Sequence, residues 1–309
     1  MENRKPGEPV IQVKDLYKIY RMGDSKVYAL NGVDFTISRG EFCAITGPSG
    51  SGKSTLLNML AGLEHPSKGE IVIAGKHIEK LNERQLVAFR RERVGFIFQS
   101  YNLIATMNAI ENVALPLSFR GMARKERTRR AKQYLKLVGL EKFMYHMPNQ
   151  MSGGQQQRVG IARALAVDPQ IIFADEPTGN LDSKTTMDVL RLMQTIVRER
   201  NQTLVMVTHD NNLATYADRI FKIIDGKIVS IEENHREVDL MALDKIVEQA
   251  AASEKNGSEN KGSDKDESEK DESEKDGSEK DGSDKDGSDE KALSPKPDKC
   301  DKQEGESIQ

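Results

Sequence analysis

The sequence predicts an α/β fold, and two observations carry that prediction. A short apolar run at 41–46 leads directly into a glycine-rich segment at 47–55, and an amphipathic helical pattern follows it. A strand, a glycine-rich loop and a helix in that order are the setting of a phosphate-binding loop. A second glycine pair opens another helical pattern at 152–154, shortly before a buried apolar run that ends in Asp175 and Glu176.

Composition divides the chain into a body and an acidic tail. The 309 residues carry a net charge of −3, yet residues 253–309 hold 20 Asp and Glu against 11 Lys and Arg. The rest of the chain is therefore mildly basic. We expect one large domain over 1–235, a short helical extension at 236–252, and the tail at 253–309.

The tail contains a short repeat of low complexity. The pattern Ser-acidic-Lys-Asp-Gly/Glu recurs from Ser263 to Gly287 without an aromatic residue. Such a composition buries too little apolar surface to offset the entropy of ordering, so we expect disorder. A flexible charged tether is the expected role, and binding of a specific partner is the alternative.

The first half of the body reads as strands around the glycine-rich loop. Alternating apolar residues predict strands at 10–20 and 27–38, the second broken near Asn31-Gly32, and 41–46 predicts a buried strand. Four leucines should share one face of the helix after the loop: Leu56, Leu57, Leu60 and Leu63. A strand at 69–74, a helix at 82–91 and a strand ending at 96–99 follow.

The second half reads as helices followed by strands. Residues 106–146 look helical, with interruptions at Pro116 and Gly121, and the basic run 124–132 is expected to be a solvated helix face. Ser152 should begin a helix that ends at Ala166. Strands are expected at 171–174 and 204–207, and a hairpin at 220–224 and 227–231 around Asp225-Gly226.

Two features bear on the cellular compartment. Cys43 and Cys300 form no disulfide framework and fit a reducing environment. No apolar region of a signal peptide follows Met1, and the longest uncharged stretch, 96–110, is short of the roughly 20 apolar residues of a spanning helix. We therefore expect any action at a membrane to need a second chain that spans it.

The segment 47–55 fits the pattern G-x-x-x-x-G-K-[ST]. Its backbone amides and the following helix N-terminus would surround phosphates, Lys53 would neutralise the β- and γ-phosphates, and Ser54 would hold Mg²⁺. An ordinary Gly/Ser turn is the alternative. The expected nucleotide-binding residues here are Gly47, Pro48, Ser49, Gly50, Ser51, Gly52, Lys53, Ser54 and Thr55.

Two further segments fit the same chemistry. Asp175, at the end of a buried strand, is placed to contact Mg²⁺, and Glu176 is placed to polarise an attacking water. A solvated acidic turn is the alternative. Ser152 is an N-cap candidate in any case, and with Gly153 and Gly154 it would make a second anion site on a helix N-terminus.

Residues 10 to about 232 resemble an ATP-binding cassette (ABC) ATPase subunit. Segment 47–55 is similar to the Walker A motif of that family and 173–176 to its Walker B motif. Segment 152–156 is similar to its signature sequence, with Met151 in place of the usual leucine.

Isolated residues extend the resemblance. Gln99 matches the Q-loop glutamine, 180–182 resembles the D-loop, and His209 matches the switch histidine. Tyr20 resembles the aromatic residue that stacks on adenine, with Tyr17 as the competing candidate.

The resemblance implies a P-loop NTPase fold of the ABC ATPase type, with a RecA-like core, an antiparallel β subdomain and a helical signature subdomain at about 100–165. It implies ATP and Mg²⁺ as cofactors and a head-to-tail homodimer in the ATP state. Glu176 and His209 would be catalytic, and the metal contacts would be Ser54, Gln99 and Asp175. The signature residues of the other copy would complete the site: Ser152, Gly153, Gly154 and Gln155.

The resemblance is greatest to the branch of macrolide exporters, lipoprotein-release complexes and FtsE-like division proteins (MacB/LolD/FtsE-like). It rests on 177–184, 102–103 and 111–117, while Ala105 and Asn108 depart from the branch's usual proline and threonine. This implies export or extraction through a separate membrane permease, at the inner face of the membrane on its cytoplasmic side. An FtsE-like ATPase or scaffold that couples to a membrane partner without transport is the alternative.

Non-transport members of the family fit less well. DNA-linked members carry a long coiled coil between Walker A and the signature, whereas here about a hundred residues intervene without sustained heptads, so no nucleic acid is expected. Translation-associated members usually carry two such domains, and this sequence has one phosphate loop. A scaffold that uses ATP only to dimerise is disfavoured by Glu176 and His209.

Overall fold

The computed structural model describes residues 7–23 and 25–234. The helical extension expected at 236–252 and the tail at 253–309 lie outside these residues. Within the described ranges, no helix is both long enough and apolar enough to cross a membrane.

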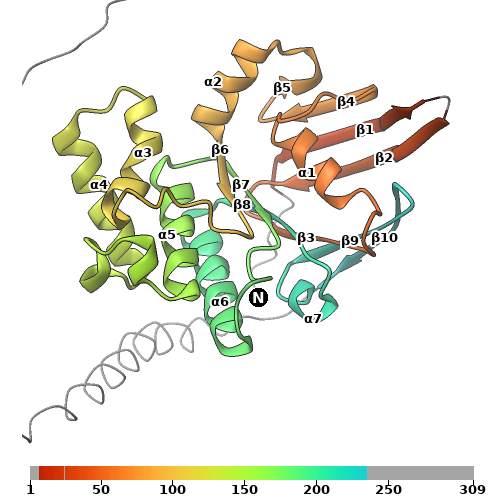
Figure 1. The fold of residues 1–309 in the computed structure, drawn as a ribbon. Coiled ribbons are helices and arrows are strands. Elements are labelled where there is room, and N and C mark those ends of the chain that lie inside the picture. Colours follow the sequence, from red (N-terminus) through yellow and green to blue (C-terminus); the bar gives the residue numbers. More distant parts are fainter. Residues whose placement is uncertain (1–6, 24, 235–309) are drawn as a thin grey trace, which may run out of the picture. The chain divides into compact units, whose positions relative to one another are not determined.

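A six-stranded sheet forms the centre of the described part of the chain (Figure 1). Its order is β10-β9-β3-β8-β7-β6, and every neighbouring pair is parallel except β9 and β10, which form the expected hairpin. The strands are β3 (Phe42–Thr46), β6 (Val94–Ile97), β7 (Ile171–Asp175), β8 (Thr203–Val207), β9 (Arg219–Ile224) and β10 (Lys227–Glu233).

The central strands are covered on both faces, which explains their continuous apolar sequences. Along β3, Phe42 and Ala44 join a core with helices α3 to α6, whereas Cys43 and Ile45 join a second core with helix α1 and the other sheet. Alternate residues of β7 and β8 divide between the two cores in the same way. Helices α5 and α1 therefore lie on opposite faces of the six-stranded sheet.

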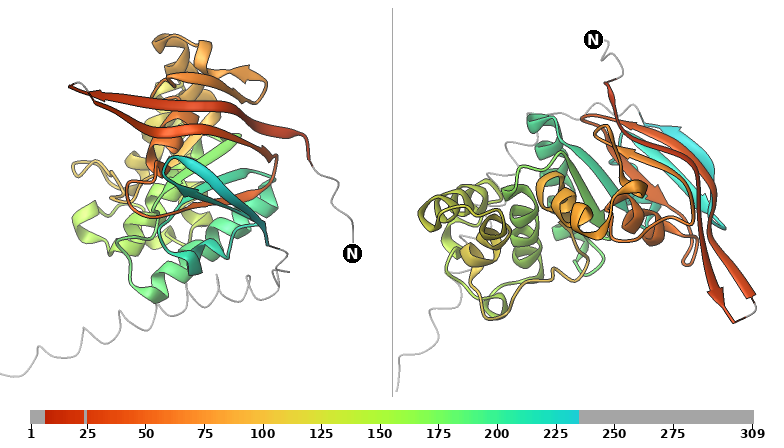
Figure 2. Two further views of the ribbon diagram at one scale, coloured as in Figure 1. Left: turned by 90° about the vertical axis from the view of Figure 1, so that its right-hand side faces the viewer. Right: turned by 90° about the horizontal axis from the view of Figure 1, so that it is seen from above.

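The second sheet is antiparallel, in the order β2-β1-β4-β5 (Figure 2). Its strands are β1 (Pro9–Met22), β2 (Ser25–Ser38), β4 (Lys68–Ile73) and β5 (Lys76–His77). Strand β2 continues through the expected break near Asn31-Gly32. The pairing passes from Val33 to Asn31 with a register shift, so Gly32, at φ 71°, is a bulge residue rather than a strand end.

Seven α-helices complete the described region: α1 (Lys53–Leu60), α2 (Glu83–Arg93), α3 (Ala109–Phe119), α4 (Arg124–Leu137), α5 (Gly153–Ala166), α6 (Ser183–Arg200) and α7 (Asn211–Ala214). Short 3-10 turns lie at Ile78–Lys80, Glu141–Phe143 and Pro148–Gln150. Helices α3, α4 and α5 pack together to one side of the sheet (Figure 1). Reciprocal hydrogen bonds cap three helices, from Asn82, Asn108 and Ser152.

Two expectations about helices were wrong, and one helix was not expected. Leu63 lies beyond α1, which ends at Leu60, and is 52% exposed. Pro116 lies inside α3 rather than interrupting it, because only three residues of the helix follow it and packing against α4 and α5 holds the helix together. The 18-residue helix α6 was not expected at all.

Candidate active site

The carboxyl ends of the parallel strands bring the predicted chemical residues to one edge of the sheet. Segment 47–55 follows β3, Gln99 follows β6, Glu176 follows β7, and His209 follows β8. The register pairs Asp175 with the last residue of β8, so these strands end side by side. Ligands of open parallel sheets bind outside this edge.

Glycine is required at two positions of the loop at 47–55. Gly47 has φ 151° and Gly52 has φ 101°. A Cβ on Gly47 would overlap the Ile223 carbonyl oxygen, and one on Gly52 would overlap the Ala29 carbonyl oxygen. Gly52 precedes α1, whose N-terminus receives no side-chain cap, which leaves its backbone N–H groups available to an anion.

Lys53 lies inside the loop. Its side chain is buried, and Nζ donates to the Gly47 carbonyl at 2.9 Å and to the Pro48 carbonyl at 2.8 Å. The positive charge also acts on Asp175, because it lowers the pKa of that carboxyl against the opposing effects of burial. The loop thus holds one buried cation at its centre.

Two adjacent carboxylates stand at the end of β7. Burial raises the pKa of Asp175, and the neighbouring Glu176 raises it further. The Glu176 backbone is left-handed at φ 43°, and its N–H donates to the Val207 carbonyl at 3.0 Å. Its Oε1 lies 3.0 Å from Nδ1 of His209, so the two residues expected to be catalytic are in direct contact.

Gln99 contacts the loop that precedes α6. The Asn180 side-chain amide donates to the Gln99 carbonyl at 3.0 Å. A Cβ on Gly179 would lie 2.7 Å from Nε2 of Gln99, so the glutamine side chain packs directly on that glycine. Asp182 caps α6, and hydrogen bonds from the Thr185 hydroxyl and backbone lower the pKa of its carboxyl.

Of the two tyrosine candidates, Tyr20 lies nearer the loop at 47–55. Its hydroxyl donates to Glu64 at 2.8 Å and interacts with Thr55, while burial and Glu64 raise the pKa of the phenol. Tyr17 instead packs beside Gly32, with Nζ of Lys68 4.9 Å from the ring centre. Stacking of adenine on Tyr20 stays a prediction.

Ser152 is separated from that loop within one copy. It caps α5, where its hydroxyl accepts from the Gln155 backbone at 3.3 Å and Gln155 Oε1 accepts from its N–H at 3.0 Å. Because α5 and α1 lie on opposite faces of the sheet, the two helix N-termini point to different parts of the surface. Over 7–23 and 25–234, no hydrogen bond joins Ser152 to residues 47–55.

The close packing at this end of α5 was not expected from the sequence. Gly154 packs on Thr185 of α6, and Gly153 packs on the hydroxyl of Tyr101. Neither Tyr101 nor α6 was singled out as part of a site. The start of the signature segment is thus fitted against both the loop after Gln99 and the start of α6.

Comparison with known proteins agrees with this geometry. The family model described as ABC transporter matches residues 30–179. An uncharacterized ABC transporter ATP-binding protein of Thermotoga maritima is 50% identical over 223 residues, which cover 72% of this chain and 95% of that protein. The macrolide export ATP-binding/permease protein MacB of Hyphomonas neptunium is 47% identical over 73% of this chain, but only 35% of MacB is covered.

A solved structure shares the fold. The ATP-binding cassette MJ0796 of Methanocaldococcus jannaschii, a dimer in a post-hydrolysis state with ADP and Pi, aligns with a TM-score of 0.68 and 45% identity, over 74% of this chain and all of that one. The expected ABC ATPase fold is thereby confirmed for the aligned region. This chain belongs to the ABC transporter family, as one of its ATP-binding, ATP-hydrolysing proteins.

Proposed function

We propose that this chain is the ATP-binding and hydrolysing subunit of an ABC transporter complex, and that it powers export or extraction through a separate membrane permease. The observation that carries the proposal is the 3.0 Å contact between Glu176 and His209, beside Asp175 at the edge that also holds Lys53. A base, an acidic metal ligand and a phosphate-binding cation belong together in an ATPase site.

We propose a role for each of these residues in hydrolysis. Lys53 and the amides of the loop hold the β- and γ-phosphates, and Glu176 accepts a proton from the attacking water. The water oxygen bonds to the γ-phosphorus as the bond to the β–γ bridging oxygen breaks, which yields ADP and phosphate. His209 touches Glu176 and is placed to respond when the γ-phosphate leaves.

The residues present fit Mg²⁺. Within the described ranges, the Asp175 side chain forms no hydrogen bond or ion pair, so its carboxylate oxygens are available to a metal ion. Mg²⁺ commonly binds through one or two carboxylates and the substrate phosphates, so a single acidic protein ligand suits it. Ser54, Asp175 and Gln99 would hold the ion, which would neutralise charge on the phosphates.

The site is completed by a second copy. Ser152 and the amides of Gly153 and Gly154 form an anion-binding helix end, yet in one copy they cannot reach residues 47–55. A head-to-tail dimer would place this end, with Gln155, against the γ-phosphate bound by the partner copy. ADP lacks that phosphate, so hydrolysis weakens the dimer.

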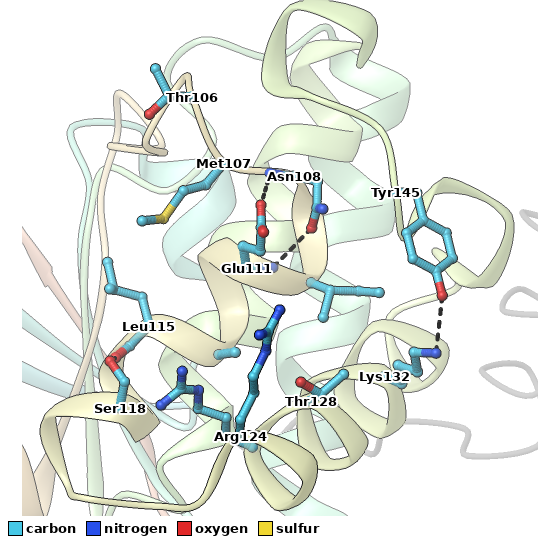
Figure 3. Close-up of a pocket in the computed structure, with 13 residues that line it drawn as sticks. Thr106, Met107, Asn108, Glu111, Leu115, Ser118, Arg124, Thr128, Lys132 and Tyr145 are labelled. Carbon is cyan, nitrogen blue, oxygen red and sulfur yellow. Dashed lines mark hydrogen bonds between the residues drawn. The ribbon is translucent and has the colours of Figure 1, made fainter.

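The helical part offers a surface for the permease. Helices α3 and α4 form the walls of a groove of about 540 Å³, with Met107 and Leu115 along one wall and Arg124 and Lys132 along the other (Figure 3). Asn108 lies at the groove and caps α3 through a reciprocal bond with Glu111, so this departure from the branch's usual threonine preserves the cap. Opening and closing of the ATP dimer would move this groove.

Glu176→Gln tests the proposal. The variant should bind ATP, lose turnover and elute as a dimer on a sizing column with ATP, and as a monomer without nucleotide. Glu70→Gln, an exposed carboxylate on β4, is the matched control and should hydrolyse ATP normally. A Glu176→Gln protein that binds ATP and stays monomeric would contradict the shared site.

A second assay addresses the partner. ATPase activity is measured with the purified chain alone, with the source membrane fraction, and with DNA. Stimulation by membranes supports the permease proposal, and stimulation by DNA alone contradicts it. Substrate movement in vesicles that contain the co-purified membrane protein separates transport from FtsE-like coupling without transport.

A further inference from the structure

The loop after Gln99 has a left-handed backbone at two consecutive residues. Tyr101 and Asn102 are consecutive residues with positive φ, 59° and 47°. Left-handed backbone dihedral angles are unfavourable for residues with a Cβ, although asparagine tolerates them better than tyrosine. Surrounding contacts must therefore hold the pair in place.

Arg163, in the last turn of α5, provides those contacts. Its guanidinium donates to the Tyr101 carbonyl at 2.7 Å and to the Asn102 carbonyl at 2.5 Å, and it lies 5.9 Å from the centre of the Phe98 ring. Burial lowers the pKa of Arg163, and none of the ion pairs among the described residues includes it. The planar guanidinium suits two neighbouring carbonyls, which a lysine could not bridge in the same way.

The Tyr101 side chain extends the connection to two more segments. Its hydroxyl lies 3.4 Å from the Asn180 carbonyl, a long hydrogen bond. The same oxygen would be 2.8 Å from a Cβ on Gly153, so the absence of a side chain there admits the hydroxyl. Asn180 in turn bonds the Gln99 carbonyl, which closes a ring of contacts around Tyr101.

We propose that Tyr101 and Arg163 are positioning residues that hold the N-terminal end of α5 in register with Gln99 and with the loop at 179–182. Arg163 fixes the strained loop from the last turn of the helix. Tyr101 fits the first turn of α5 against the loop at 179–182. Since Ser152 caps the same turn, a displaced loop displaces the group that contacts the ATP of the second copy.

This inference rests on the proposed shared site, but it concerns closure of the dimer and not ATP binding by one copy. Neither Tyr101 nor Arg163 has a hydrogen bond to residues 47–55 within the described chain, so ATP binding by one copy should not depend on them. Closure of the dimer and turnover should depend on both.

The test uses Arg163→Met and Tyr101→Phe, each in the full chain and each also combined with Glu176→Gln. In the combined variants, the protein concentration for half-maximal dimerisation with ATP should rise about 10-fold for Arg163→Met and about 3-fold for Tyr101→Phe. In the active background, kcat should fall by similar factors while KM and monomer affinity for ATP change less than about 2-fold.

Arg130→Met is the matched control. Arg130 also donates to a backbone carbonyl, that of Ala166 at the C-terminus of α5 at 2.6 Å, but within the described ranges it has no hydrogen bond to residues 101–102. It should lower the melting temperature without changing dimerisation. Equal weakening of dimerisation by Arg130→Met and Arg163→Met would reduce Arg163 to general support of the helix and overturn its role.

Two more outcomes are decisive. Tyr101→Phe keeps the ring and removes one hydroxyl, so a variant with parental kcat and dimerisation would overturn the role of Tyr101. If Glu176→Gln itself fails to dimerise, the shared site is wrong. The kcat of Arg163→Met and Tyr101→Phe in the active background then still decides the inference, which an unchanged kcat would refute.

Discussion

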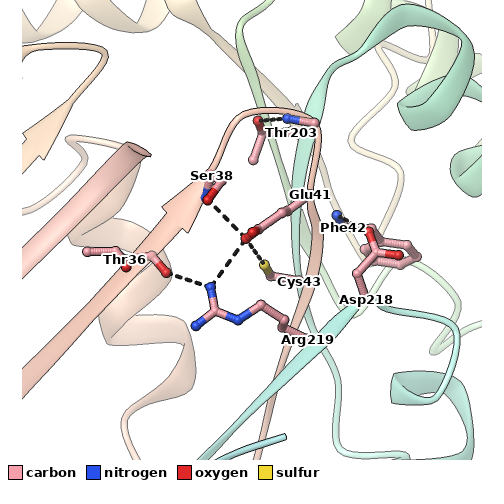
Figure 4. Close-up of polar contacts among 9 residues, drawn as sticks. Thr36, Ser38, Glu41, Phe42, Cys43, Thr203, Asp218 and Arg219 are labelled. Carbon is pink, nitrogen blue, oxygen red and sulfur yellow. Dashed lines mark hydrogen bonds and ion pairs between the residues drawn. The ribbon is translucent and has the colours of Figure 1, made fainter. Parts of the chain in front are cut away.

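Charged residues lie at both ends of the parallel strands of the six-stranded sheet, and the two ends differ in how these charges are arranged. We call them the carboxyl edge and the amino edge. At the carboxyl edge, Asp175 and Glu176 stand side by side, and the pKa of Asp175 is raised by burial and by its neighbour. At the amino edge, the Glu41 carboxylate accepts from the Ser38 backbone at 3.1 Å and pairs with Arg219 at 3.3 Å (Figure 4). One edge keeps carboxylates close to one another, and the other pairs its carboxylate.

The amino-edge contacts join both sheets. Arg219, the first residue of β9, also donates to the Thr36 carbonyl of β2 at 2.9 Å. The thiol of Cys43 on β3 lies 3.7 Å from Glu41, and burial raises its pKa well above the ordinary value, so this cysteine stays a neutral thiol. The cluster therefore connects the antiparallel sheet to β3 and β9.

This difference shows how one sheet separates stability from chemistry. Paired charges near strand starts hold the two layers together. Crowded charges and left-handed backbone, such as that of Glu176 at φ 43°, collect at strand ends, where substrate and metal can compensate them. Variants at the two edges should therefore affect different measurements.

The largest effect is expected from Asp175→Asn. Removing the carboxylate proposed to hold Mg²⁺ should lower kcat about 10²–10³-fold. The same change should raise the melting temperature of the nucleotide-free protein by roughly 2 °C, because it relieves a crowded carboxylate. Steady-state ATPase assays measure kcat and thermal melts measure stability. A variant that loses both activity and stability would contradict the proposed difference between the two edges.

The stability gain should depend on pH with a defined sign. The folded pKa of Asp175 is raised, so ionisation destabilises the fold, and this cost grows as pH rises from the unfolded pKa through the folded pKa. The difference between Asp175→Asn and the parent should be full above the folded pKa and vanish in acid, where Asp175 is protonated. A difference that stays constant with pH would exclude this cause.

Lys53→Ala should have the next largest effect. Loss of a charge-assisted contact to phosphate should weaken ATP binding about 100-fold by calorimetry. Because Nζ bonds only carbonyls of its own loop among the described residues, the free energy of unfolding should change by less than about 1.5 kcal/mol. Lys76→Ala, an exposed lysine on β5, is the control, and unchanged affinity in Lys53→Ala would remove the phosphate role.

The amino edge should respond in the opposite manner. Arg219→Ala leaves the mostly buried Glu41 carboxylate without its cation and should cost about 2 kcal/mol of unfolding free energy in urea titrations. ATP affinity should stay within about 2-fold. Adding Glu41→Gln should recover part of the loss, and a double variant no more stable than Arg219→Ala would show that the pair is not coupled.

The sequence predicted which residues gather at the carboxyl edge better than the contacts that position them. Residues 47–55 and Asp175 are parts of local patterns next to buried strands, so composition and spacing suffice. Arg163 lies 62 positions from Tyr101 and contacts backbone carbonyls. Because every residue has a backbone carbonyl, the sequence does not indicate which one an arginine will contact. Glu41 and Arg219 are 178 positions apart, and only the sheet order brings them together.

The sequence of helix α6 contains a capping residue and an amphipathic pattern. Asp182 accepts from the Thr185 backbone at 3.0 Å as an N-cap, and Val189, Met193 and Ile196 bury one face of the helix. Segment 180–182 resembles the D-loop, and that resemblance alone does not predict a helix after it. Pro116 is the opposite case. Proline predicts an interruption of the helix, but packing of α3 against α4 and α5 keeps the helix continuous.

The smallest effect is expected from deletion of residues 253–309. This deletion tests whether activity at the carboxyl edge and stability at the amino edge are independent of the tail. The tail carries net negative charge and has a low-complexity composition, and we expect it to act as a flexible tether. Its deletion should therefore leave kcat and ATP affinity within about 2-fold, and the unfolding free energy within about 0.5 kcal/mol, of the parent. A scrambled tail of equal composition is the control. Loss of kcat on deletion that the scrambled tail restores would indicate a charge effect on the carboxyl edge. A loss restored only by the native repeats would show that the active site depends on a sequence-specific contact with the tail, and the tether role would be wrong.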